Sequence, residues 1–170
     1  TCLNIEDTEV MLKGVSMVKA MKDFINRSKS TVPSSPLPSV KNELGSLTPG
    51  KQQLVWFGHS SYLVSSNGFT ILVDPVFSGN ASPFSFFAKA FEGSNIYAAE
   101  DMPEIDLLLL THDHYDHLDY NSISHLKSKA IKFYAPLGVG QHLVHWGVAE
   151  NSITEFDWWD SEEIFPGIQL

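Results

Sequence analysis

The sequence predicts an α/β layered fold, in which helices cover a sheet. Strand-like segments follow one another from residue 52, and the Asn67-Gly68 pair between two of them is a strong hairpin signal. Residues 105–110 form a continuous apolar run of strand length, as expected for a strand buried on both faces. Helix-like and strand-like segments alternate after this run. A β-meander followed by β/α alternation indicates an α/β architecture.

Local patterns predict the elements in order. Strands are expected at 52–57, 61–65, 69–74, 105–110, 131–135 and 152–156, helices at 119–129 and 137–146, and the first arm of a further β element at 163–170. The connection 75–104 is long enough to be a lid or a binding loop. It contains phenylalanines that either cover the core, which is the favoured interpretation, or face acyl chains: Phe84, Phe86, Phe87 and Phe91.

Residues 1–50 differ from the rest of the chain, which divides it into 1–50 and 51–170. Apolar residues recur at helical spacing over 10–29, among lysines and an arginine, and predict a basic amphipathic helix. Packing of its apolar stripe on its own domain is favoured, and peripheral contact with an anionic membrane is the alternative. Residues 30–40 hold three prolines and four serines, which is typical of an extended strap.

Composition excludes several classes of protein. Hydrophobic residues make up 43% of the chain, as in globular proteins. A net charge of −9 argues against a nucleic-acid partner. A single cysteine, Cys2, excludes an internal disulfide framework and a cysteine-based zinc site. No apolar run is long enough to span a membrane, and the compartment stays open between cytoplasmic and membrane-associated.

Residues 111–119 (Thr-His-Asp-His-Tyr-Asp-His-Leu-Asp) directly follow the buried run, where α/β folds place ligand sites. In an extended segment His112 and His114 point the same way and can close on one metal. Asp116 and His117, expected at the start of the next helix, can turn to a second metal. Imidazole and carboxylate together suit Zn²⁺, Fe or Mn. Three other histidines lie in predicted helices and are interpreted as surface or core-edge residues: His125, His142 and His145.

This motif resembles the signature of the metallo-β-lactamase superfamily. The surrounding sequence is similar to the branch of hydrolases that resemble N-acyl-phosphatidylethanolamine phospholipase D. The similarity extends from about Lys51 to Asp160, through the segments 56–61, 74–83, 102–106, 111–120, 135–138 and 157–159.

The resemblance implies a fold and a set of roles. The chain would be the N-terminal half of an αβ/βα metallo-β-lactamase sandwich. His112 and His114 would ligate one of two zinc ions, and the catalytic pair Asp116 and His117 would ligate the other. Tyr115 would touch substrate, and Asp74 would support the site from behind. His59 is expected near the same site, either as a functional residue or as a hydrogen-bonded structural histidine.

The resemblance also implies that something further is needed. A complete member has a second half that supplies one more histidine to each metal and a bridging aspartate. This chain alone is therefore expected to bind metal weakly and to expose apolar sheet surface. A homodimer is the expected assembly.

The implied activity is that of a zinc-dependent hydrolase, a phospholipase D-like phosphodiesterase that uses a zinc-bridged hydroxide on a phospholipid-like substrate. A lactonase or small-ester hydrolase of the same fold is one alternative. A metal-free half-domain that acts as a binding scaffold is the other.

Overall fold

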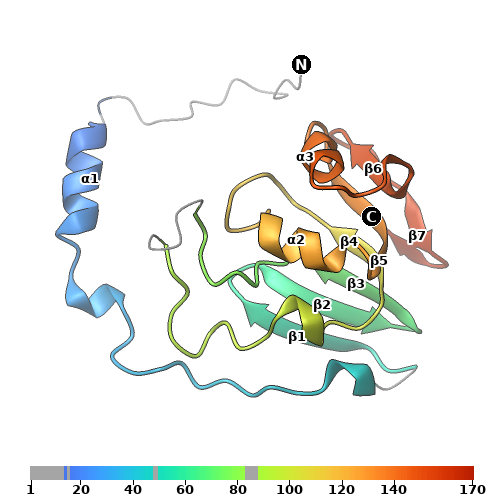
Figure 1. Ribbon diagram of the computed structural model, residues 1–170, viewed down its shortest axis with the longest axis horizontal. Coiled ribbons are helices and arrows are strands. Elements are labelled where there is room, and N and C mark those ends of the chain that lie inside the picture. Colours follow the sequence, from blue (N-terminus) through green and yellow to red (C-terminus); the bar gives the residue numbers. More distant parts are fainter. Residues whose placement is uncertain (1–13, 15, 48–49, 83–87) are drawn as a thin grey trace.

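The fold centres on a six-stranded sheet (Figure 1). The computed structural model describes residues 14, 16–47, 50–82 and 88–170. The strands lie in chain order across the sheet: β1 Gln53–Gly58, β2 Ser61–Ser66, β3 Phe69–Val73, β4 Ile105–Leu109, β5 Ala130–Pro136 and β6 Ile153–Phe156. The pairs among β1, β2 and β3 are antiparallel, and those from β3 to β6 are parallel. The predicted α/β fold class is confirmed.

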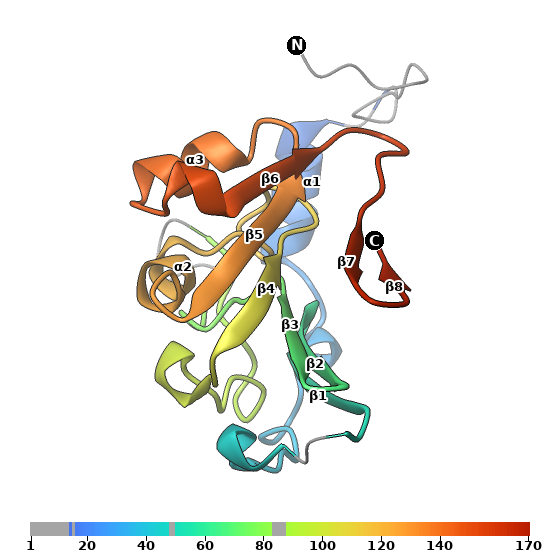
Figure 2. The same cartoon turned by 90° about the vertical axis from the view of Figure 1, so that its right-hand side faces the viewer.

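Two helices cover one face of the sheet, and a small hairpin lies against the other (Figure 2). The helices are α2 Tyr120–Leu126 and α3 Gly140–His145, and the hairpin is β7 Glu163–Phe165 with β8 Ile168–Gln169. Both helices are shorter than predicted, because Asp119 caps α2 and Gly138, at φ 91°, cannot continue a helix toward residue 137. Residues 163–170 hold both arms of the hairpin rather than its first arm, because Gly167 turns the chain back at φ 80°.

The core lies between the sheet and the two helices. Its fully buried members come from strands and helices alike, and include Leu63, Leu72, Leu108, Ile123 and Leu143. On β1, Val55 and Phe57 face this core. Leu54 and Trp56 therefore point to the opposite face of the sheet, where they are 66% and 65% exposed. That face carries the exposed apolar surface expected from the sequence.

The basic amphipathic helix is present as α1, Met17–Ile25, and Ser16 caps its first turn. Residues 10–13 and 15 of the predicted helix lie outside the described residues. Val18 is 79% and Ile25 is 72% exposed, so the expected packing of the apolar stripe on its own domain is wrong for the part that the structure describes. None of the described helices is long and apolar enough to cross a membrane.

The strap that follows α1 runs along the connection between β3 and β4. It begins with a short 3-10 helix, η1 Lys29–Thr31, which the prediction of a strap without helix did not include. Leu37 N donates to Glu92 O at 2.8 Å, and Ser39 Oγ donates to Gly93 O. The strap ends near the 3-10 helix η2 Leu44–Ser46, where Leu44 is buried in the core. The strap therefore holds one side of the long connection in place.

The described part of the long connection contains a short helix and packs partly into the core. The 3-10 helix is η3 Ala99–Asp101, and a further one, η4 Glu150–Ser152, precedes β6. Phe77 and Tyr97 pack on Phe57 through edge contacts. Phe91 is 45% exposed and is not part of the core cluster, so the interpretation of the loop phenylalanines as core cover is wrong for this residue. Phe84, Phe86 and Phe87 lie outside the described residues.

Candidate metal centre

One edge of the sheet gathers the residues that the sequence singled out. β1 and β3 are both antiparallel to β2, and β4 is parallel to β3, so the carboxyl ends of β1, β3 and β4 lie at the same edge. His59 follows β1, Asp74 follows β3, and the loop 111–117 follows β4. The topology therefore brings together segments that are far apart in the sequence.

Asp74 is the buried anchor of this edge. It is 1% exposed, and its carboxylate accepts hydrogen bonds from Thr111 N at 2.8 Å, Thr111 Oγ1 at 2.6 Å and His117 Nδ1 at 2.8 Å. Its backbone lies at φ 42°, an unusual value for a residue other than glycine. Three hydrogen bonds to one carboxylate, with Asp74 N bonded to Leu109 O, hold the residue in that conformation.

The hydrogen bond that Asp74 accepts from His117 also fixes the tautomer of His117. A carboxylate only accepts hydrogen bonds, so the imidazole proton lies on Nδ1, which faces it. The other nitrogen, Nε2, is then left with a lone pair that can bind a metal. Asp74 thus contacts His117 directly, and its support of a metal site stays a prediction.

The motif folds as a turn before α2. His117 N and Leu118 N both donate to His114 O, at 2.9 and 2.8 Å. Asp116 and His117 were expected at the start of the helix. They lie in this turn instead, because Asp119 caps α2 and the helix begins only at Tyr120.

Donor atoms of the site residues converge in two groups. In each group the donor atoms lie within 4.8 Å of one another: His112, His114 and Asp116 form one, and His59, Asp116 and His117 form the other. The first group contains the predicted pair His112 and His114. The second contains the predicted pair Asp116 and His117. Asp116 belongs to both groups, which the sequence-based division of ligands did not foresee. The role of each residue as a ligand stays a prediction.

His59 enters the site through Asp116. Its Nε2 lies 2.9 Å from Asp116 Oδ2, and its ring meets the His117 ring edge-on at 5.3 Å between centroids. Its backbone has a positive φ of 47°. The sequence left His59 open between a structural and a functional role, and the structure brings its ring nitrogen to a carboxylate of the motif.

Local charges favour the protonation states that bind metals. Burial, with the neighbouring imidazoles of His117 and His114, lowers the pKa of His112 below its ordinary value. Burial by itself would raise the pKa of Asp116, but its backbone hydrogen bond and the nearby His117 and His59 outweigh it and lower that pKa. The site thus favours a neutral imidazole at His112 and an ionised carboxylate at Asp116. These are the forms that ligate metal ions.

The donor set fits a transition-metal ion. Each group offers imidazole nitrogens with a carboxylate oxygen, the chemistry of zinc and non-haem iron or manganese sites. Three protein donors with further positions open is the arrangement of catalytic rather than structural sites. The hydrogen bond that His117 Nδ1 donates to Asp74 supplies the outer partner that metal-bound imidazoles normally have.

A groove of about 780 Å³ opens beside the first donor group. His114 and Asp116 line it together with Tyr115, Tyr120 and Trp146. Tyr115 is 58% exposed, so its phenol is accessible from the groove. Tyr120 and Trp146 form an edge contact at 5.4 Å, which joins α2 to the end of α3. Sequence reasoning missed both residues, because nothing local in the sequence relates these two helices.

The remaining histidines lie outside both donor groups. His125 Nδ1 bonds to Asn121 O of its own helix at 2.8 Å. His145 is exposed on α3, and His142 lines the groove without a carboxylate partner among the described residues.

Thr111 is a site residue that the sequence analysis did not single out. Its hydroxyl bonds Asp74 and lies 3.0 Å from His112 Nδ1.

The family follows from comparison with known proteins. The model of the family described as "Beta-lactamase superfamily domain" matches residues 70–170, which is more than half of the chain. The chain belongs to this family. The matched region includes Asp74 and the whole motif 111–117.

Similar proteins come from bacteria and from an animal. An uncharacterized protein of Mycobacterium tuberculosis is 32% identical over 143 residues, which are 84% of this chain and 38% of that protein. The N-acyl-phosphatidylethanolamine-hydrolyzing phospholipase D 1 of Caenorhabditis elegans is 33% identical over 113 residues, or 64% of this chain and 32% of that protein. A UPF0173 metal-dependent hydrolase of Thermodesulfovibrio yellowstonii is 33% identical over 57% of this chain and 33% of its own. The chain thus spans about a third of the length of these relatives.

A solved structure shares the fold. CmlA, a diiron β-hydroxylase from Streptomyces venezuelae, superposes with a TM-score of 0.53 at 25% identity, over 68% of this chain and 22% of its own. This similarity extends beyond the hydrolases to a diiron β-hydroxylase. The identity of the metal therefore does not follow from the fold.

Proposed function

We propose that this chain carries metal-binding residues of a metal-dependent hydrolase whose substrate is a phosphodiester. The observation that carries the proposal is the sharing of Asp116 between two groups of donors, with His117 oriented by Asp74. Two donor groups that share a carboxylate suit a pair of neighbouring metal ions. The family and the relatives named as metal-dependent hydrolases support the same reaction class.

The residues of this chain would divide the work among them. When bound, metal ions supply Lewis acidity, which makes a water molecule nucleophilic near neutral pH and polarises the scissile group. His112, His114, Asp116 and His117 would hold the ions, and Asp74 keeps Nε2 of His117 free for this role. His59 holds Asp116 Oδ2 at 2.9 Å and so fixes the direction of the shared carboxylate. Tyr115 would contact the substrate from the groove.

More specifically, we propose that the substrate is a phospholipid-like phosphodiester and that the metal is zinc. The phospholipase D of C. elegans supports a phospholipid-like substrate, since its similarity to this chain extends over 113 residues. The groove is lined mostly by polar residues, and its aromatic side chains, Tyr115, Tyr120 and Trp146, are compatible with an acyl or glyceryl group beside the donors. The N and O donor set supports zinc, and it suits iron as well, the metal of CmlA.

Hydrolysis assays on the purified protein test this proposal. The substrates are N-acyl-phosphatidylethanolamine, a small activated phosphodiester and a sugar-phosphate lactone. His114→Ala is expected to lower the hydrolysis rate by more than the roughly 10–100-fold that follows when a metal ligand loses its outer hydrogen-bond partner. His125→Ala is the matched control, because this exposed histidine bonds its own helix. Cleavage of the lactone alone would contradict the phosphodiester, and equal activity of both variants would contradict the site.

A further inference from the structure

The helix α1 has an apolar face bordered by basic residues. At about 100° per residue, Val18, Met21 and Ile25 fall on one side of the helix. Lys22 lies at the border of that side, and Lys19 lies toward the opposite side with Asp23. The basic residues continue past the helix through Arg27 and Lys29. An amphipathic helix of this kind has a preferred orientation at a boundary between water and an apolar phase.

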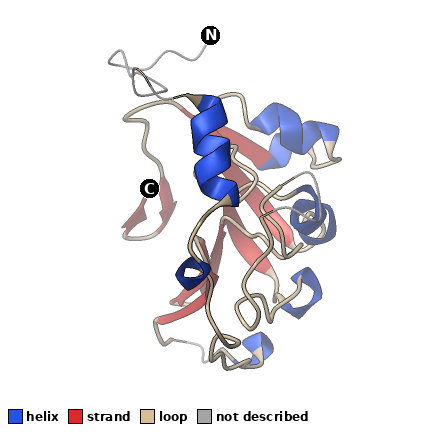
Figure 3. Ribbon diagram, turned by 90° about the vertical axis from the view of Figure 1, so that its left-hand side faces the viewer, coloured by secondary structure: helices blue, strands red, loops and turns tan. Residues whose placement is uncertain are grey.

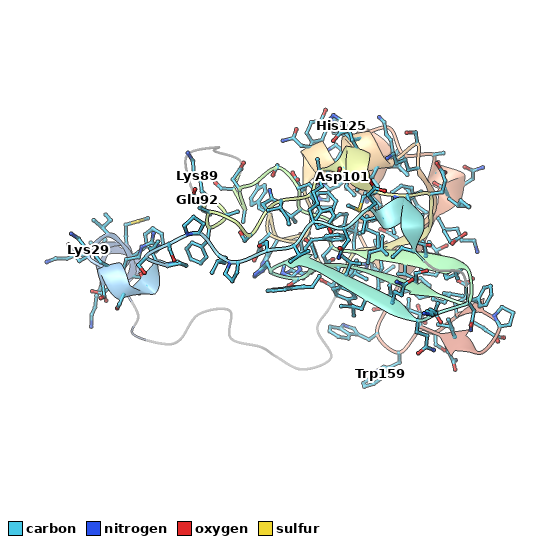
Figure 4. The ribbon with its side chains drawn as sticks, turned by 90° about the horizontal axis from the view of Figure 1, so that it is seen from below. Lys29, Lys89, Glu92, Asp101, His125 and Trp159 are labelled. Carbon is cyan, nitrogen blue, oxygen red and sulfur yellow. The ribbon has the colours of Figure 1, made fainter. Side chains whose placement is uncertain are left out.

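The apolar face of α1 is exposed. Val18, Met21 and Ile25 are 79%, 54% and 72% exposed. In Figure 1 and Figure 4 the helix lies apart from the sheet and from the other helices, and Figure 3 shows it outermost with no helix or strand over it. A helix of nine residues is marginal in water by itself, so this face calls for a partner.

The charge of the segment identifies the kind of partner. Between Ser16 and Thr31 there are four basic residues against one acidic residue, Asp23, in a chain whose net charge is −9. In the part of the chain that the structure describes, no carboxylate forms an ion pair with these cations: Lys19, Lys22, Arg27 and Lys29. Lys29 lies at the outer end of the segment, away from the body of the molecule (Figure 4). A partner with negative charges over an apolar interior complements both the apolar face and the basic residues.

We propose that α1 lies flat on an anionic lipid surface. Val18, Met21 and Ile25 would enter the boundary between headgroups and acyl chains, and the lysines would contact the lipid phosphates. The helix is too short to span the bilayer, so the contact is peripheral. The strap, bonded to the long connection through Leu37 and Ser39, would then tie the surface-bound helix to the domain that carries the donor groups. This inference concerns a segment outside the site and does not depend on the hydrolase activity.

Vesicle sedimentation tests the proposal. The protein is mixed with vesicles of phosphatidylcholine alone or with about 30% phosphatidylserine. Binding is expected only to the anionic vesicles, and high salt should weaken it because salt screens charges. Each basic residue near such a surface contributes roughly a five-fold gain in partitioning, so Lys22→Glu should lower binding by at least about five-fold.

Matched variants separate the helix from general effects of charge and hydrophobicity. Lys51→Glu makes the same charge change just before β1, and Leu54→Ser removes an apolar side chain whose 66% exposure is close to the 72% of Ile25. Ile25→Ser should weaken binding, and both controls should bind like the wild type. Circular dichroism confirms that each variant is folded.

Several outcomes would overturn the proposal. Neutral and anionic vesicles could take up the protein equally, or neither could take it up. The loss of binding could also be the same in the α1 variants and in their controls. If the α1 variants instead change the oligomeric state without an effect on vesicle binding, a second copy of the chain covers the helix and the lipid proposal is wrong. Hydrolysis of a soluble diester, measured in parallel, reports on the proposed function alone.

Discussion

His117 Nδ1 and Asp74 Oδ2 lie 2.8 Å apart and join the turn after β4 to the end of β3. This bond lies behind the donor groups, with His117 only 13% exposed at its side chain and Asp74 at 1%. It orients the His117 nitrogen that is predicted to bind metal, while Asp74 itself belongs to neither donor group. A substitution of Asp74 therefore tests how the orientation of His117 affects metal binding, because it leaves the number of donor atoms unchanged.

Asp74→Asn is expected to weaken metal binding by about 10–100-fold, because an amide no longer forces the proton of His117 onto Nδ1. Competition with a coloured chelator measures the affinity. Asp106→Asn is the control, since the Asp106 carboxylate also accepts a backbone hydrogen bond, from Thr70 N at 2.7 Å, away from the donor groups. Equal affinities of the two variants would refute the role given to Asp74.

His59→Asn tests the contact with Asp116. Asparagine tolerates the positive φ of 47° at this position, so the variant removes the ring nitrogen at little backbone cost. The affinity for metal should fall, because Asp116 loses the partner that holds Oδ2 at 2.9 Å. His125→Asn serves as the comparison and should bind metal like the wild type. If His59→Asn also retains full affinity, His59 is a structural residue.

The raised pKa of Tyr134 leads us to expect that the protein loses stability at alkaline pH. Burial, with the Glu162 carboxylate nearby, raises the pKa of Tyr134 to about 12, against about 10 in the unfolded chain. The stabilisation is fully present below pH 10 and is lost as the pH rises toward 12, because only the unfolded state then releases the proton. For a side chain that is 1% exposed, two units correspond to roughly 2–3 kcal/mol. Urea unfolding over this range measures the loss.

Two variants test whether Tyr134 causes this loss of stability at alkaline pH. Tyr134→Phe should remove the part of the loss above pH 10, since phenylalanine has no proton to release. Glu162→Gln should bring the pKa of Tyr134 closer to its ordinary value, which ultraviolet absorbance of the phenolate records. An alkaline unfolding curve that is unchanged in Tyr134→Phe would count against this account.

Gly93 tests the contact between strap and loop. A Cβ there would collide with the backbone of Leu37, 2.9 Å from its nitrogen and closer still to its oxygen, and the residue has φ +85°. Gly68 has nearly the same φ, +83°, with nothing within 4 Å of the place that a Cβ would take, so Gly68→Ala carries only the backbone cost of about 1–2 kcal/mol. Gly93→Ala should lower the free energy of unfolding by more and should expose the strap to protease. Equal losses in the two variants would mean that the strap does not depend on this contact.

The sequence predicted the sheet well because its signals are local. Alternation in β2, the Asn67-Gly68 turn and the apolar run of β4 each identify a strand without knowledge of the rest of the fold. The packing of α1 could not be predicted in this way. Its amphipathic pattern indicates that one face is more stable in an apolar environment. The pattern does not indicate whether the domain itself, a second protein or a membrane provides that environment.

The sequence identified most of the candidate site residues, but it did not predict how they are arranged in space. The spacing of His112, His114, Asp116 and His117 indicates metal chemistry from sequence alone. The position of Asp116 in both donor groups follows from the turn closed by His114 O, which the sequence does not reveal. His59 and Asp116 are 57 positions apart, so only the sheet topology brings them together. The homodimer, the division at residue 50 and the absence of a nucleic-acid partner stay predictions.

Metal content is the most direct test of the central claim that the donor groups bind metal. The protein is loaded with zinc or iron and dialysed against buffer that holds the free metal at a fixed concentration, because this chain alone is expected to bind metal weakly. Mass spectrometry then measures the metal in the wild type, Asp116→Ala and Asp113→Ala. Asp113 lies in the same loop and belongs to neither donor group, so its variant controls for loss of a nearby charge. Retention of metal by the wild type and by Asp113→Ala, with loss in Asp116→Ala, is the predicted result. Equal metal in all three proteins, or none in the wild type, would contradict the account.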